Sequence, residues 1–123
     1  MKEETPEKHR ENADLDRFDG PLAAPAHHRL VYEDERVRIV EFRVPPGDFV
    51  PVHTHRYATL NYVVAHSDFV SYDADGRPKF DSRTGPSAIR EGEVFRLAPY
   101  PPLHAVENVG DSELHGLSVE FKD

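Results

Sequence analysis

Short apolar runs separated by turn-forming residues make up the chain from Arg29 onward. Within several of these runs apolar and polar side chains alternate, as in the segment from Arg36 to Val44. Such alternation is typical of strands with one buried face. No segment between Arg29 and Asp123 keeps the 3.6-residue period of an amphipathic helix. The pattern therefore predicts an all-β fold, an antiparallel barrel or sandwich.

Gly, Pro, Asp and Asn residues mark the boundaries of the expected strands. The tetrapeptides at 45–48 and 73–76 combine fixed and positive φ values, as tight reversals require, and 90–93 and 110–112 do the same later. The predicted strands are Arg29–Glu33, Arg36–Val44, Phe49–His53, Ala58–Ala65, Asp68–Asp73, Pro78–Asp81, Ser87–Ile89, Val94–Ala98, His104–Asn108 and Glu113–Phe121.

The first 20 residues are charged and lack an apolar period, which predicts a flexible charged tail at residues 1–20. A weak helix from Pro6 to Phe18 is compatible with the same segment. Residues 21–123 are expected to form a single barrel domain, because a chain of 123 residues accommodates one domain.

Composition excludes several classes of function. A formal net charge of -8 and the lack of any basic run argue against binding to nucleic acid. The absence of cysteine excludes disulfides, thiolate metal sites and cysteine nucleophiles. No segment has the apolar character of a signal peptide or a membrane span, so we expect a cytoplasmic protein without membrane partners.

His53 and His55 are the first candidate metal ligands. Residues two apart on an extended strand point to the same face, so both imidazoles are expected to enter the same space. Two buried neighbouring imidazoles need partners, and one shared divalent cation would satisfy both. The alternative for this pair is an ordinary His-x-His on an exposed edge. His104, after a proline-rich segment, is a third candidate, and its alternative is a histidine that caps a strand.

The spacing Gly47-x5-His53-x-His55, followed by Gly92-x6-Pro99-x4-His104-x3-Asn108, resembles the two signature motifs of the cupin superfamily. The resemblance covers about residues 36–121 and implies a cupin-type double-stranded β-helix, or jelly-roll, barrel. It further implies that His53, His55 and His104 bind a metal ion inside that barrel. Among small single-domain cupins, the chain looks most like the beta-alanine degradation protein-like group.

The sequence departs from the cupin pattern where a glutamate ligand usually follows the second histidine. Thr59 and Leu60 occupy those positions, an extra residue separates Gly92 from Pro99, and Pro101 replaces a usual glycine. The resemblance therefore implies a site of three neutral ligands with open coordination positions, which suits Fe, Zn, Ni or Mn. Several cupin dioxygenases have such a site.

Two classes of function follow from this site. The first is a metal-dependent enzyme, dioxygenase-like, that acts on a small organic metabolite. The alternative is a non-catalytic module that binds a metal ion or a small molecule, or a barrel that the metal merely stabilises.

Further candidates for the site are polar residues on the expected inner face. Tyr57 and Asn61 share the parity of His55, and His115 is in phase with Leu117, so all three are candidate catalytic residues. For His115 the alternative is a hydrogen-bonded core histidine. Exposed sheet edges in a small barrel also predict a homodimer, formed largely by residues 28–33.

Overall fold

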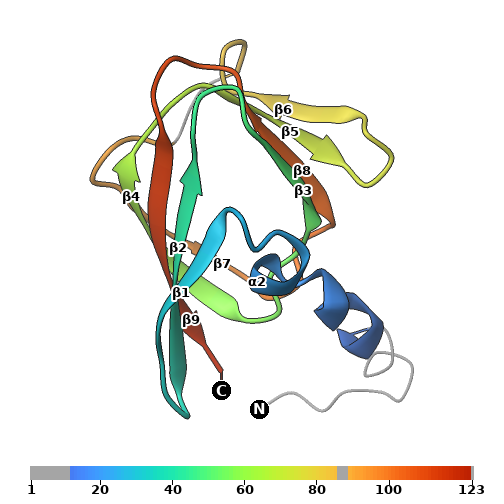
Figure 1. The fold of residues 1–123 in the computed structure, drawn as a ribbon, viewed down its shortest axis with the longest axis vertical. Helices are drawn as coiled ribbons and strands as arrows, with labels where there is room; N and C mark the ends of the chain where they lie inside the picture. Colours follow the sequence, from blue (N-terminus) through green and yellow to red (C-terminus); the bar gives the residue numbers. More distant parts are fainter. Residues whose placement is uncertain (1–11, 86–88, 123) are drawn as a thin grey trace.

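Two antiparallel sheets form an open barrel in the computed structural model, which describes residues 12–85 and 89–122 (Figure 1). Within these ranges, no helix is long and apolar enough to span a membrane. The strands are β1 (His28–Glu33), β2 (Val37–Val44), β3 (Phe49–His53), β4 (Ala58–Ala65), β5 (Phe69–Asp73), β6 (Pro78–Asp81), β7 (Val94–Leu97), β8 (His104–Asn108) and β9 (Leu114–Phe121).

The strand order is β1-β2-β9-β4-β7 in one sheet and β3-β8-β5-β6 in the other, and every pairing between these strands is antiparallel. The prediction of an all-β jelly-roll barrel is confirmed. Nine of the predicted strands are present with ends displaced by one residue at most. The tenth, Ser87–Ile89, falls largely on residues 86–88, which lie outside the described residues.

The inner face of the five-stranded sheet follows from its register. On β2 the even-numbered residues Val40 and Val44 are 1% and 0% exposed, so this parity faces the interior. On β9 their partners are also even-numbered, because Val40 pairs with Ser118 and Val44 with Leu114. Val50 from the opposite sheet packs in the same apolar cluster as Val44 and Leu114. Burial of these β-branched side chains between two sheets holds the barrel together.

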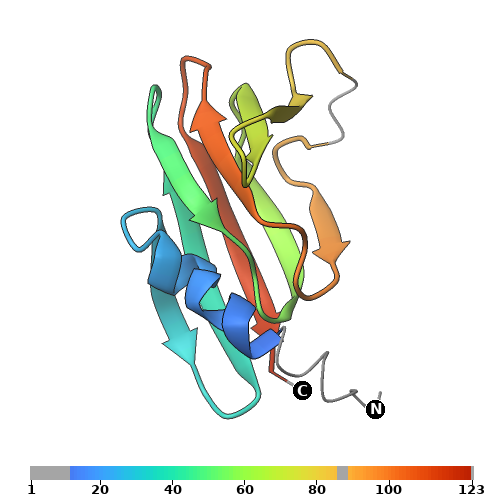
Figure 2. The same cartoon turned by 90° about the vertical axis from the view of Figure 1, so that its right-hand side faces the viewer.

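A short helical segment precedes the barrel and packs beside β1 and β3 (Figure 2). It contains a 3₁₀ turn, η1 (Asp16–Phe18), and one turn of α-helix, α2 (Gly20–Ala23). Thr54 N–H donates to the Phe18 carbonyl at 2.7 Å, and Gly20 N–H donates to the Thr54 carbonyl at 2.9 Å. The structure thus differs from the predicted tail at residues 12–20, which pack on the barrel, whereas residues 1–11 lie outside the described residues.

Buried charge explains why this segment adheres to the barrel. The Asp19 carboxylate, 1% exposed, accepts hydrogen bonds from the Arg38 guanidinium at 2.7 Å and from the Arg56 backbone N–H at 3.0 Å. Arg38 also pairs with Glu120 on β9. A buried carboxylate is tolerated only with such partners, so Asp19 fixes the segment to both β2 and the loop after β3.

Candidate metal centre

Four imidazoles from separate parts of the barrel meet at one end of its interior. His28 begins β1, His53 ends β3, His55 follows it in the next loop, and His104 begins β8. The ring centroids of His53 lie 4.8 Å from His28, 5.0 Å from His55 and 4.4 Å from His104. The His55 centroid lies 5.8 Å from His28 and 5.4 Å from His104. The three histidines predicted from the sequence are therefore together, and His28 joins them.

Pairing between β3 and β8 produces the central contact, because His53 is directly opposite His104. His55 is placed by the loop that follows. Its carbonyl accepts a hydrogen bond from Tyr100 N–H at 2.7 Å, and the next residue, Arg56, is held by Asp19. Tyr100 adopts a positive φ of 54°, and its hydroxyl donates to Asp16 at 2.6 Å.

Backbone carbonyls fix the orientation of three of the four rings. Nδ1 of His53 lies 2.8 Å from the Pro51 carbonyl, and Nδ1 of His104 lies 2.8 Å from the Pro102 carbonyl. Nδ1 of His28 lies 2.9 Å from the Ala24 carbonyl. A carbonyl oxygen only accepts, so Nδ1 carries the proton in each ring and Nε2 of the neutral imidazole keeps its lone pair. This arrangement is the one that metal-binding histidines commonly have.

Burial keeps these imidazoles neutral. Desolvation lowers the pKa of His53 to about 2, of His55 to about 3 and of His28 to about 4, with repulsion between the histidines adding to the effect. Burial also lowers the pKa of His104. Neutral imidazoles are the form that binds metal ions, so no proton has to be displaced at neutral pH.

Three of the four histidines, His28, His53 and His55, fit a metal ion in both spacing and chemistry, and His104 lies beside them against His53. Nε2 of His28 is buried without a hydrogen-bond partner, which is costly unless something else occupies its lone pair. One ligand atom each from His28, His53 and His55 lies within 4.8 Å of the others. Two nitrogens that bind the same tetrahedral zinc-sized ion are about 3.3 Å apart, so the rings would have to move closer together to bring these atoms into coordination.

His28 was not predicted as a ligand. The sequence placed it in the segment 28–33, which is the expected dimer edge, and nothing in the local pattern marks it as inward. It points inward because it pairs with Phe42, which packs against the core. One sequence signal does accompany two of the ligands: a proline lies two residues before both His53 and His104, and each supplies the carbonyl that orients the ring.

The three candidate catalytic residues have different environments. Asn61 lines the cavity and donates from its amide to Thr59 Oγ1 at 2.8 Å. Tyr57 does not line the cavity among the described residues, and its ring stacks on the guanidinium groups of Arg38 and Arg56, at 5.0 and 4.9 Å. Neither position supplies a metal ligand.

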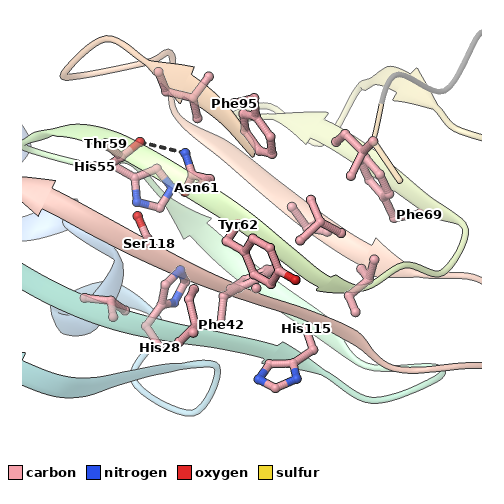
Figure 3. Close-up of a pocket in the computed structure, with 18 of the residues that line it drawn as sticks. His28, Phe42, His55, Thr59, Asn61, Tyr62, Phe69, Phe95, His115 and Ser118 are labelled. Atoms are coloured by element: carbon pink, nitrogen blue, oxygen red, sulfur yellow. Dashed lines mark hydrogen bonds between the residues drawn. The ribbon is translucent and has the colours of Figure 1, made fainter. Parts of the chain in front are cut away.

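His115 differs from its predicted inward orientation. By register it shares a face of the sheet with Arg43 and Glu41, opposite to the parity of Val40. Its Nε2 lies 2.8 Å from Glu41 Oε2. The residue borders the cavity, but its ring lies apart from His28 and His55 in Figure 3.

Among the residues that the structure describes, no acidic ligand takes the place of the glutamate of the usual cupin motif. Thr59, at one of those positions, is 2% exposed and inward, whereas Leu60 faces out at 40% exposed. Thr59 on β4 pairs with Glu120 on β9, and Glu120 supplies the carboxylate that lines the described part of the cavity. Arg38 holds it in an ion pair that Asp19 shares, and Glu120 is not one of the clustered ligands, so the centre itself consists of neutral ligands.

A cavity of about 380 Å³ opens beside the four histidines. Figure 3 shows polar Thr59, Asn61 and Ser118 near His55, with Phe69 and Phe95 farther along the wall. The volume lies within the range of sites for small molecules.

Comparison with known proteins identifies the fold. No family model matches the sequence, and no curated protein matches it. A cupin domain from Bordetella pertussis Tohama I is similar in structure, with a TM-score of 0.62, 21% identity, and coverage of 78% of this chain and 92% of that one. An RmlC-like cupin with a double-stranded β-helix from Methanocaldococcus jannaschii has a TM-score of 0.54, 16% identity, and coverage of 76% and 77%.

A polyketide cyclase from Streptomyces resistomycificus is also similar, with a TM-score of 0.52 and 20% identity over 78% of this chain. The matched region spans 64% of the cyclase. At these identities the similarity concerns the fold alone. The chain has the double-stranded β-helix fold of the cupins.

Proposed function

We propose that the protein binds a divalent transition-metal ion through His28, His53, His55 and His104. We further propose that it is a metal-dependent enzyme, dioxygenase-like, acting on a small organic metabolite in the adjoining cavity. Membership of the beta-alanine degradation protein-like group is part of the same proposal. The observation that carries it is the convergence of four neutral imidazoles, three of them with Nδ1 committed to backbone carbonyls.

The residues around the centre would hold the ion rigidly and keep water away. Hydrogen bonds to Ala24, Pro51 and Pro102 fix the rings before any ion binds, which reduces the entropy lost on binding. His53 is 1% exposed, so the centre is shielded from solvent on that side. When bound, Fe, Zn, Ni or Mn would supply Lewis-acid or redox chemistry at the edge of the cavity.

One observation favours a non-catalytic binding module instead. Glu120, the carboxylate on the described cavity wall, is ion-paired with Arg38 and is therefore poorly placed to transfer protons. Such a module would bind its ligand tightly without converting it.

Elemental analysis of the purified, untagged protein tests the metal site. We expect about one transition-metal ion per chain, and loss of that ion in His53→Ala. His66→Ala, which changes a histidine outside the cluster, is the control and should retain the metal. A metal-free protein that binds no Fe, Zn, Ni or Mn at micromolar concentration would overturn the proposal. Oxygen uptake by the iron-loaded protein with candidate substrates then distinguishes an enzyme from a binding module.

We also propose a homodimer formed through β1. This strand is at the edge of the five-stranded sheet, and Leu30, Val31 and Tyr32 are 47%, 47% and 50% exposed. Antiparallel pairing of two copies about Val31 would place Arg29 of each opposite Glu33 of the other, which is a self-complementary arrangement. Light scattering should give twice 14.0 kDa. Val31→Lys should give monomers, and a monomeric unmodified protein would exclude the dimer.

A further inference from the structure

The cavity beside the histidine cluster is polar at one end and apolar along most of its wall. The register of the five-stranded sheet places Asn61 between Ser118 on β9 and Phe95 on β7, all on the inner face. Asn61 therefore lies one strand away from an aromatic side chain, and Ser118 lies two strands away. The apolar part of the wall includes Phe42, Val63, Phe69, Phe95, Leu97 and Val106.

The described residues at this end of the cavity carry little net charge. The four imidazoles are neutral, and the carboxylates of Asp19 and Glu120 share one guanidinium, that of Arg38, so these three groups carry at most one net negative charge. A divalent cation held by these ligands would leave at least one positive charge uncompensated in a weakly polar enclosure, where such a charge is costly. A bound anion would restore the balance, and no Lys or Arg lines the described wall to bind a second anionic group.

We propose that the cavity takes a compact organic monoanion with an aromatic or other apolar body and an acidic end that chelates the metal ion. This inference rests on the proposed metal site and specifies its substrate class. Highly hydroxylated sugars and phosphate esters would leave too many polar groups unpaired against the phenylalanine-lined wall. A cation with the same apolar body would be repelled by the metal ion.

Asn61 is the positioning residue for this ligand. Its amide is held by the hydrogen bond to Thr59 Oγ1, at 2.8 Å, so its remaining polar groups have a fixed direction. Ser118 lies directly across the strand pair. Together they can bind the oxygen atoms of the acidic end beside the histidines, while the aromatic body rests on Phe95.

Cobalt-loaded protein provides a test that does not depend on turnover, because the visible spectrum of bound Co²⁺ reports on exchange of its ligands. Salicylate, an aromatic hydroxy acid, is compared with glycolate, which has the acidic end without the ring, and with benzylamine, which has the ring with a positive charge. We expect salicylate to bind at least about tenfold more tightly than glycolate, and benzylamine not to bind. Equal binding of salicylate and glycolate, or binding of benzylamine, would overturn the inference.

Variants locate the binding. Phe95→Ala should weaken salicylate binding about tenfold and leave glycolate unchanged, whereas Val94→Ala, on the outer face of the same strand at 56% exposed, should change neither. Asn61→Leu should weaken both hydroxy acids about fivefold with unchanged cobalt affinity. If cobalt fails to bind, the proposed metal site is wrong. If cobalt binds and these preferences are absent, only the substrate class is wrong.

Discussion

The polar side chains at the two ends of β8 differ in how completely they are hydrogen-bonded within the protein. At its last residue, Asn108, the side-chain oxygen accepts from Ser67 Oγ and Gly110 N–H, both at 3.0 Å. The side-chain nitrogen donates to the Val44 and Ser112 carbonyls, both at 2.8 Å. At the first residue, His104, only Nδ1 has a protein partner among the hydrogen bonds of the described residues.

This difference in hydrogen bonding distinguishes a structural cluster from a candidate binding site within one small core. A buried amide with four partners fixes three loops and needs nothing further. A cluster of neutral imidazoles with an unpartnered Nε2 on His28 costs stability unless a ligand binds there. The first end is a closed hydrogen-bond network, and the second is a set of donors suited to binding an ion.

Acid should affect the histidine end most strongly. The folded-state pKa values of His28 and His53, about 4 and about 2, lie below the ordinary value of 6.5. Above pH 6.5 these groups are neutral in both states and contribute nothing to pH dependence. As the pH falls below 6.5 the unfolded chain takes up protons that the folded chain does not, so stability decreases. For these two groups the loss is roughly 3 kcal/mol per pH unit, which should unfold the metal-free protein before pH 4.

Urea titrations at pH 7, 6 and 5 measure this loss. His53→Leu should reduce the slope by about 1.4 kcal/mol per pH unit, since one titrating group is removed. Metal-loaded protein should unfold at a lower pH than metal-free protein, because the ion competes with protons for the same nitrogens. A metal-free protein equally stable at pH 7 and pH 5 would contradict the assignment of buried neutral histidines.

A third buried polar cluster, of charged groups, sharpens the comparison. Arg38 bridges Asp19 and Glu120, both 1% exposed. Arg38→Met should therefore cost about 3–5 kcal/mol of unfolding free energy, because two carboxylates lose their partner. Arg29→Met is the matched control. Arg29, 70% exposed, pairs with Glu41, and its loss should cost at most about 1 kcal/mol. Equal costs for the two variants would mean that Arg38 is not a buried partner.

Removing one polar side chain from the Asn108 network and one from the histidine cluster tests the comparison directly. Asn108→Ala should destabilise the protein by about 3 kcal/mol, since buried carbonyl and N–H groups lose their partner. His28→Leu should change the stability of the metal-free protein by less than about 1 kcal/mol or increase it, because it removes an unsatisfied nitrogen. In the metal-loaded protein the sign for His28→Leu should reverse. Thermal unfolding followed by circular dichroism measures both variants.

Local patterns predicted most of this molecule, and long-range packing decided the rest. Alternation and turn residues defined the strands, and the two-residue spacing of His53 and His55 defined half of the centre. The orientation of His115 was missed because β9 carries apolar residues on both faces, Leu114 inside and Leu117 outside. The two-residue alternation of a strand was therefore visible in the sequence, but which of the two sets of side chains faces the interior was not. His28 was missed because its position depends on pairing with β2.

The smallest expected effect concerns the close contact between Gly20 and the ring of His28. A Cβ atom added to Gly20 would lie 2.8 Å from His28 Cδ2 and 2.9 Å from its Nε2, closer than side-chain atoms tolerate. Gly20→Ala should therefore displace the ring, weaken metal binding about tenfold and cost about 1 kcal/mol of stability. Gly85→Ala, whose Cβ would meet nothing closer than 3.5 Å, is the control and should alter neither quantity. If Gly20→Ala lowers stability but leaves metal affinity unchanged, His28 is a core residue and the centre consists of the other three histidines. If it weakens metal binding, the segment before the barrel contributes to the site by holding its fourth ligand.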